Sequence, residues 1–493
     1  MAPPPQKINK PKKKSEKKSE QKDRQVTLPF LSKLEKSKEK ITEKLGIRFE
    51  PWPLFIFGVV ILFASFVFMS GNVSLALSLA LYLAPVWLSF LLIGGAWRIW
   101  IVLKRSEFIA GQKYILLEIK PPRSLVKTPL AMETFLSSIH LTGGEATWYA
   151  RFKGGIRPFW SLELASFEGR VHFFIWGRAD FRRIIESQMY AQYPGVQMVE
   201  VPDYTRLISA TPEEWGIWGC DFKQTAPDPL PIKTYVEYKL DTVEKEPEQV
   251  DPLANLVEFM GSIGKGEYLW LQFVIRAHKG EKYGTTPAGN SSSKRNAEGE
   301  PYTWKDEGRE LVQSIRAQTV GKVKYRDLFT GEMRETEGFP NPTKGQSEKM
   351  AAIERNVSKL AFDVGARAIY LAKPEHFNGP TIGHMIALFK PFSTEGWNGI
   401  NSTSWMKTFD DYPWEIGVEK RKNHFRRQLI EAYRRRQFFY NPFFEGDKNG
   451  RNAMVMSTEE LATIFHIPSR SVESPALERI QSATGEAPPN LPT

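Results

Sequence analysis

Two long uncharged segments constrain the fold of this chain more than any other feature. Trp52–Ser70 and Leu75–Trp97 contain no Asp, Glu, Lys, Arg or His over 19 and 23 residues. As a helix, each segment is long enough to cross a hydrocarbon core about 30 Å thick. Only residues 71–74 separate them, so the sequence predicts a transmembrane helical hairpin spanning residues 51–105. Because neither segment carries an ionisable side chain, the hairpin is expected to be an anchor rather than an ion pathway.

The flanks of the hairpin are basic on both sides. Residues 1–50 hold 15 Lys and Arg against 7 Asp and Glu, whereas the whole chain has 67 against 56. Arg98, Lys104 and Arg105 follow the second segment. The positive-inside rule therefore places both termini in the cytoplasm, with the protein in the inner membrane. Residues 1–50 are expected to form a disordered basic tail followed by a juxtamembrane amphipathic helix.

The sequence lacks the common catalytic and metal-binding motifs. A single cysteine, Cys220, excludes an intrachain disulfide and any CxxC site. Gly-Lys pairs occur at residues 264–265 and 321–322, but neither is preceded by the glycine of a phosphate-binding Walker A loop. No HExxH or GxSxG motif is present. We therefore expect no catalytic residue, no metal and no cofactor, and a protein that is not an enzyme.

Residues 106–205 predict a compact α+β module. Alternating apolar residues at 113–121 indicate a strand, and Thr128-Pro129 opens a helix. A hairpin turns at Glu168-Gly169, and a second helix follows Asp180 before a final strand at 196–201. The order β-α-β-β-α-β is that of the ferredoxin-like, split βαβ arrangement. Another α+β sandwich remains open as the alternative.

Residues 206–400 partly repeat this order and predict a second α+β module. A strand is expected at 234–240, a helix after Asp251-Pro252, and further strands at 267–278 and 366–373. Helices are expected near 305–318, 346–362 and 382–388. The polar segment 279–300 predicts a disordered insertion. The expected fold class is thus α+β, with a two-helix transmembrane hairpin followed by a cytoplasmic body of one or two ferredoxin-like modules.

Residues 401–493 contain an arginine-rich stretch interleaved with aromatic side chains at 419–440. The candidate nucleic-acid or partner-binding residues are Lys420, Arg421, Lys422, Arg426, Arg427, Arg434, Arg435 and Arg436. Arginines pair with phosphates and aromatic rings stack on unpaired bases, so single-stranded nucleic acid is one candidate ligand. Docking to an acidic partner or to membrane headgroups is a second interpretation. A helix that packs its apolar face on the core and solvates its arginines is a third.

Four segments resemble membrane-anchored proteins of Patescibacteria that are associated with conjugation-type, type IV secretion ATPases. They are Trp160–Glu163, Glu186–Val196, Ser457–Pro468 and Pro488–Pro492. In similar proteins the last segment leads into a HerA-like or TraG-like motor domain, which this sequence does not contain. The resemblance implies a non-catalytic component of a DNA- or protein-translocation machine that docks a separate P-loop ATPase, and the chain itself is a candidate homo-oligomer. A structural scaffold of a secretion or cell-envelope complex without nucleic-acid contact is the alternative.

The segment Ser457–Pro468 also carries the candidate motor-docking residues. Ser457 or Thr458 is expected to cap a short helix ahead of two glutamates. The residues expected to face the motor are Glu459, Glu460, Phe465 and His466.

Overall fold

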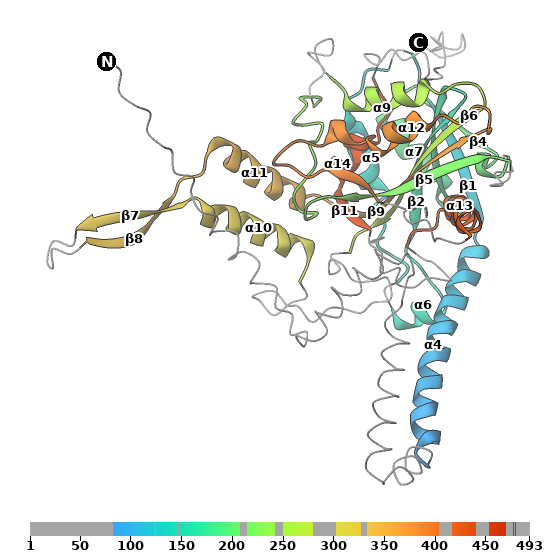
Figure 1. The fold of residues 1–493 in the computed structure, drawn as a ribbon, viewed down its shortest axis with the longest axis horizontal. Coiled ribbons are helices and arrows are strands. Elements are labelled where there is room, and N and C mark those ends of the chain that lie inside the picture. The colour runs from blue at the N-terminus through green and yellow to red at the C-terminus, as the bar shows by residue number, and fades with distance from the viewer. Residues whose placement is uncertain are drawn as a thin grey trace, which may run out of the picture. The chain divides into compact units, whose positions relative to one another are not determined.

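The structure is a computed structural model that describes most of the chain after residue 81. The described residues are 82–123, 125–145, 147–207, 214–241, 250–279, 302–326, 333–403, 417–439 and 453–469, with Leu477 and Arg479. The chain divides into two compact units. The larger one, residues 92–408 with 417–493, contains every described strand (Figure 1).

The first half of the larger unit is built on four strands and two helices. The strands are β1 Tyr114–Lys120, β2 Phe159–Phe167, β3 Arg170–Arg178 and β4 Gln197–Val201. Helix α5 Pro129–Ser138 follows β1, and the short η1 Ala179–Phe181 leads from β3 into α7 Arg182–Gln192. The spatial order β2-β3-β1-β4, antiparallel throughout, is the strand order of the split βαβ arrangement.

The second half repeats that order with its own strands. They are β5 Gly216–Gln224, β6 Glu267–Ala277, β9 Ala361–Ala372 and β10 Ile400–Thr403. Helix α9 Pro252–Gly261 follows β5, and α12 Gly379–Ile386 follows β9. The spatial order β10-β5-β9-β6 matches the first half element by element.

The two halves form one continuous sheet because β2 pairs antiparallel with β6. Glu163 lies opposite Gln272 at the middle of this pairing. Since β2 and β6 occupy equivalent places in their halves, the pairing relates the halves by an approximate two-fold axis. A ninth strand, β11 Met454–Ser457, adds to β9 beside residues 361–364. Residues from both ends of the chain's described part therefore share one sheet.

Successive side chains on the strands point alternately into two separate apolar layers. Leu117, Leu162 and Phe273 face the layer that contains α5, α7, α9, α12 and the short helix α14 Thr458–Ile464. Leu116, Phe174 and Trp270 face the opposite layer, which contains α13 Val418–Arg434. Because both faces are covered, the central strands β2, β6 and β9 are buried at nearly every position. Figure 1 shows the first set of helices above the sheet and α13 at its other side.

An insertion between β6 and β9 forms what we call the arm, residues 304–358. It comprises α10 Trp304–Gln318, β7 Val320–Arg326, β8 Met333–Pro340 and α11 Lys344–Ser358. Capping boxes at Thr303 and Thr343 start both helices. In the first half, the equivalent connection is only the turn at Glu168 and Gly169, with φ angles of 51° and 87°. The β7–β8 hairpin extends away from the sheet beyond the ends of α10 and α11 (Figure 1).

The remaining described elements are one long helix and three short ones. The long helix is α4 Ala84–Ala110, and the short ones are α6 Trp148–Phe152, α8 Tyr204–Leu207 and η3 Lys390–Phe392.

The predicted transmembrane hairpin is wrong. Among the described residues, no helix is both long and apolar enough to cross a membrane. Residues 75–81 of the second predicted span lie outside the described residues. The inner-membrane location depended on the hairpin and is corrected with it. The first predicted span, 52–70, and the tail at 1–50 lie outside the described residues.

The fold-class prediction needs a further correction, because the body is one nine-stranded sheet rather than a chain of separate modules. The strand predicted at 234–240 is a series of turns, and the first strand of the second half is β5. Asp180 lies within η1 and does not cap α7, whose N-cap is Phe181. The expected disordered insertion at 279–300 lies almost wholly outside the described residues.

Candidate functional site

Helix α13 carries most of the arginine-rich stretch and lies against β5 and α8. Its buried residues are Leu429, Ile430 and Tyr433, spaced so that they share one face. Arg426 contributes to this packing, because its Nε donates a hydrogen bond to the carbonyl oxygen of Ile217 at 3.3 Å. The helix is therefore docked on the sheet through an apolar stripe, and its charged side chains divide between the interface and the surface.

Arg436, which follows α13, lies in the core rather than at the surface. Its side chain is 1% exposed and sits over the middle of the β2–β6 pairing. Its Nε donates to Glu163 Oε1 at 2.9 Å, and its Nη2 donates to Glu163 Oε2 at 3.2 Å and to Asp203 Oδ1 at 3.1 Å. The prediction that Arg436 binds nucleic acid or a partner is wrong, since these carboxylates occupy its guanidinium.

The carboxylates and tyrosines around Arg436 form one hydrogen-bonded network. Glu163 also accepts from Tyr204 at 2.8 Å and from Gln272 at 3.1 Å, and the Tyr204 and Tyr433 hydroxyls are 2.8 Å apart. Burial, reinforced by the charge of Glu163, raises the pKa of both tyrosines well above the usual range. Burial alone would lower the pKa of Arg436, but Glu163 and its other carboxylate partner raise it. The network thus holds a permanently charged arginine and two neutral tyrosines.

The other basic residues of the stretch are partly neutralised within the chain. Glu431 pairs with Arg434 at 3.4 Å and with Arg435 at 3.1 Å. Glu419 lies 3.9 Å from Lys422 and 3.7 Å from Arg426. Lys420, Arg427 and Arg435 are exposed, while Arg421, Lys422, Arg426 and Arg434 are half-buried. The exposed basic surface is therefore smaller than the sequence suggests.

The aromatic residues of the stretch are largely committed to packing. Tyr433 is fully buried, and Phe439 is buried with the guanidinium of Arg276 over its ring at 4.5 Å. The Phe438 ring covers Gly365 closely enough to leave no room for a Cβ there. These rings cannot stack on unpaired bases while they remain in place. The mechanism predicted for single-stranded nucleic acid is thus not available to them.

The candidate motor-docking residues are also in the core. Glu459, Glu460, Phe465 and His466 are each at most 2% exposed. Glu459 pairs with Lys359 at 2.8 Å and Arg355 at 3.1 Å, and His466 Nε2 lies 3.0 Å from Asp251 Oδ2. The Phe465 ring packs against Phe173 and Phe273. The prediction that these side chains face a partner is wrong, because they hold α14 against the sheet and α5.

The contacts of Glu460 explain why the sequence of Ser457–Pro468 predicts the start of a helix. Ser457 caps α14, and the Glu460 carboxylate accepts from the Ser457 amide at 3.0 Å, which completes a capping box. The same carboxylate accepts from the Ile232 amide at 3.1 Å. Burial raises the pKa of Glu460 to about 8. The sequence predicts the cap at Ser457, whereas Ile232, the second hydrogen-bond partner of Glu460, belongs to a loop far away in the sequence.

A second buried ion cluster was missed by sequence reasoning. Asp363 of β9 accepts from Arg276 at 2.6 and 3.0 Å and from His278 at 2.7 Å. Burial alone would raise the pKa of Asp363, but these two partners lower it.

Among the described residues, no cluster of three or more His, Cys, Asp or Glu could hold a metal ion. Cys220 is buried, which raises the pKa of its thiol and makes it a poor nucleophile.

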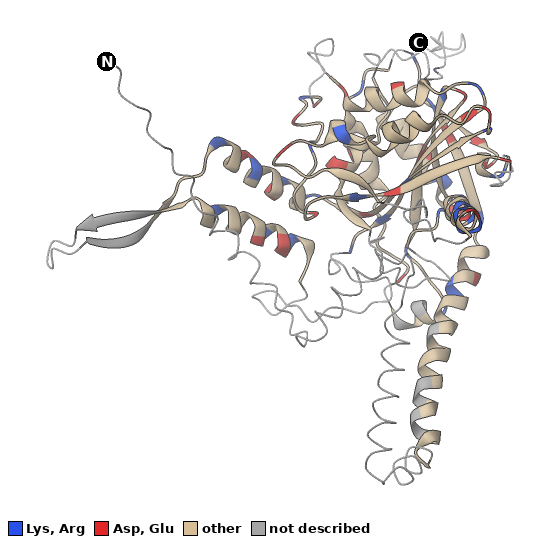
Figure 2. Ribbon diagram, viewed as in Figure 1, with Lys and Arg blue, Asp and Glu red and all other residues tan. Residues whose placement is uncertain are grey.

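The arm offers a surface of a different kind. Its base is tied to the body, because Asn356 donates to the Pro229 carbonyl at 3.2 Å and Met350 and Ile353 pack with Leu230. Its hairpin carries Phe339, which is 96% exposed. Figure 2 shows both signs of charge along α10 and α11. Among the described surfaces, this one combines an anchored base with an exposed apolar side chain at the neck of a hairpin, beside the Val320–Pro340 pair.

No protein-family model matches this chain, and no curated protein matches it. The resemblance to secretion-associated proteins therefore stays a prediction.

Proposed function

We propose that this chain is a non-catalytic docking component that assembles a separate P-loop translocation ATPase, and that the arm is the part that contacts it. The observation that carries the proposal is the arm itself. It replaces a two-residue turn of the first half with two helices and a hairpin that extends beyond the sheet. Trp304 of α10 packs against Ala361 and Val455, whereas none of the described side chains of the hairpin belongs to a buried cluster. A partner is therefore our explanation for the hairpin.

The hairpin has the features of a pairing element. In the described part of the chain, β7 and β8 pair only with each other, so both outer edges of this two-stranded sheet are open. A lone hairpin is marginally stable in water, and open edges pair readily with strands of another chain. The exposed Phe339 adds an apolar contact at the same place. These features support docking of a protein rather than of a small molecule.

The body supports the proposal as a rigid platform. Ion pairs join segments far apart in sequence, such as Arg436 with Glu163 and His466 with Asp251. Three of the four segments that resemble secretion-associated proteins lie in this platform, in β2, in α7 with the turn after it, and in β11 with α14. The fourth, Pro488–Pro492, lies outside the described residues. The resemblance therefore favours a shared scaffold, and it points to a translocation ATPase as the class of partner.

The arm can be tested by removing its hairpin alone. The Asn341 amide donates to the Thr319 carbonyl at 3.2 Å, so the chain already closes at the neck of the hairpin. A short Gly-Ser linker in place of residues 320–340 should leave α10 and α11 undisturbed. Full-length and shortened chains would be recovered from nuclease-treated lysates of the native cells, and co-purifying proteins identified by mass spectrometry.

We expect the full-length chain to recover a P-loop ATPase in near-equal amounts and the shortened chain to recover at least tenfold less. Phe339→Ser should weaken recovery, whereas Val250→Ser, which removes another exposed apolar side chain, should not. Equal recovery by the shortened chain would eliminate the arm as the docking element. Recovery of only this chain or of envelope components would instead favour the scaffold alternative.

Nuclease treatment distinguishes direct docking of the ATPase from its recovery through nucleic acid that both proteins bind. Because the aromatic rings near α13 are packed and Arg436 is paired in the core, we expect ATPase recovery to survive the nuclease. This geometry favours a component without nucleic-acid contact at α13. Loss of the ATPase on nuclease treatment would contradict that reading.

A further inference from the structure

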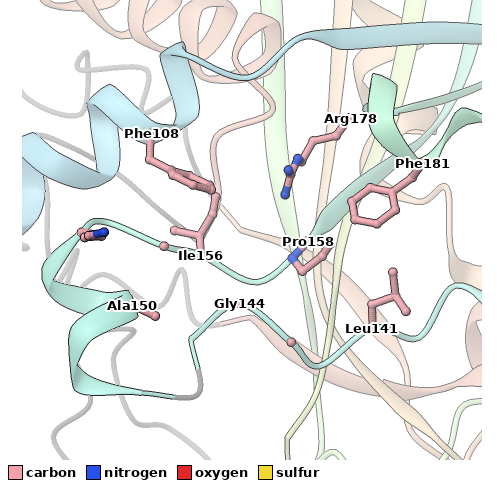
Figure 3. A pocket seen from close by; sticks show the side chains of 11 residues that line it. Phe108, Leu141, Gly144, Ala150, Ile156, Pro158, Arg178 and Phe181 are labelled. Atoms are coloured by element: carbon pink, nitrogen blue, oxygen red, sulfur yellow. The ribbon is translucent and has the colours of Figure 1, made fainter.

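A cavity of about 660 Å³ lies at one end of the first half, where α4, α6 and the start of η1 meet. Phe108 of α4 and Phe181 of η1 form opposite parts of its wall, and Ile156 and Pro158 form its floor (Figure 3). Its volume is within the range of about 300–1,000 Å³ that is typical of small-molecule sites. Most of the lining is apolar.

Glycines give this cavity its shape. A Cβ on Gly144, at φ 106°, would overlap the carbonyl of Ile156, and one on Gly154, at φ 80°, would overlap that of Lys104. The loop after α5 and the loop after α6 therefore pack backbone against backbone, and the second also packs against α4. Larger residues at either position would force the loops apart. Close backbone packing therefore fixes the two loops that carry part of the lining.

Arg178 supplies the main charge in the cavity. Its guanidinium lies between two rings, 5.2 Å from the centroid of Phe181 and 5.8 Å from that of Phe108, and points inward (Figure 3). Its Nη2 donates to Asp180 at 3.0 Å, but its Nε is buried and makes no hydrogen bond. The guanidinium end of Arg178 lines the cavity, so its terminal N–H groups can donate charge-assisted hydrogen bonds to an anion there.

The other charge in the described lining is also positive, which matches an anionic ligand. Lys153 is the other charged residue that lines the cavity, and its Nζ lies 4.5 Å from the Tyr149 ring. Among the described residues that line the cavity, none is acidic. Asp180, the existing partner of Arg178, is largely exposed and can be displaced at little cost.

We propose that this cavity binds a small organic anion with a flat apolar body and one carboxylate. The apolar body lies between Phe108 and Phe181, and the carboxylate accepts hydrogen bonds from Arg178. The site does not depend on docking by the arm, so either proposal can fail without the other.

Calorimetric titration of the full chain with 1-naphthoate, and with the uncharged 1-naphthalenemethanol, tests the proposal. We expect saturable binding of 1-naphthoate below about 1 mM and at least tenfold weaker binding of the alcohol, because a charge-assisted hydrogen bond is lost. Arg178→Gln should weaken 1-naphthoate about tenfold or more and leave the alcohol nearly unchanged. Arg183→Gln, an exposed arginine on the next helix, is the matched control and should bind like the unmodified chain.

Two further variants keep the test decisive if Arg178→Gln disturbs folding. A Cβ on Gly143 meets no atom within 4 Å, so Gly143→Leu should fill the cavity without a backbone clash and block both compounds. Asp180→Asn removes the competing carboxylate and should tighten 1-naphthoate severalfold. The proposal is overturned if 1-naphthoate does not bind, if the alcohol binds equally well, or if Gly143→Leu has no effect.

Discussion

Replacing Arg436 with glutamine should destabilise the body strongly, because the change leaves charges buried without a partner. Arg436 donates two hydrogen bonds to Glu163, at 2.9 and 3.2 Å, and two to Asp203, of which one is 3.1 Å long. Glu163 is 0% exposed, so it cannot recover hydration when the guanidinium is gone. Breaking a buried pair by removing one partner costs about 3–5 kcal/mol. Arg436 has φ 49°, but glutamine meets the same backbone strain, so that cost cancels.

Urea denaturation followed by circular dichroism measures the difference directly, and thermal scans should show a loss of roughly 5–10 °C. Arg435→Gln is the matched control. Arg435 pairs with Glu431 at the surface, with both side chains about half exposed. Exposed pairs contribute about 0–1 kcal/mol, so the control should change little.

A double-mutant cycle locates the effect in the cluster. Glu163→Gln should also destabilise the chain, but adding it to Arg436→Gln should cost much less than the sum of the two. The reasoning is refuted if Arg436→Gln and Arg435→Gln cost the same, or if the two core changes simply add.

Two more predictions follow from buried contacts on β9. The pKa of Asp363 is lowered in the folded chain, so its stabilising effect is fully present above about pH 4 and is lost as the pH falls through its pKa in the folded chain. Urea titrations should therefore show the largest difference in free energy of unfolding between the unmodified chain and Asp363→Asn near neutral pH. A difference that does not narrow towards pH 3 would contradict this assignment. Gly365→Ala should cost about 1–3 kcal/mol, because the new Cβ would overlap the Phe438 ring. Phe438→Leu should offset part of that loss in thermal scans of the double variant, whereas strictly additive losses would show that the ring is not the obstacle.

Much of the local structure could be predicted from short-range patterns. Asp251 caps α9 with its side chain, Ser457 and Glu460 form a capping box, and Glu168-Gly169 makes the β2–β3 turn. Each of these depends on residues within a few positions of one another, so the necessary information is contiguous in the sequence. The predicted strand at 234–240 is wrong because it depends on local alternation alone. The strand that lies between β10 and β9 and pairs with both is β5.

The candidate site was less predictable because charge alone does not say where a side chain lies. Arg434, Arg435 and Arg436 are consecutive, yet they are half-buried, exposed and fully buried in turn. Arg436 is buried because Glu163, 273 positions earlier, faces it from β2. No pattern within the arginine-rich stretch contains that partner. The same applies to Glu459 and His466, whose partners lie on α11 and before α9.

The sequence by itself determined the secondary-structure order of the first half, several helix caps, and the places where helices of the arm begin. It could do so because alternation, caps and turns act between neighbouring residues. Only the tertiary structure decided that β2 pairs with β6 to merge two halves into one sheet, that α14 lies within the core, and that the charged groups of the C-terminal region mostly serve as internal ion pairs. Those outcomes depend on which distant surfaces meet and exclude water, and that is a property of the folded chain as a whole.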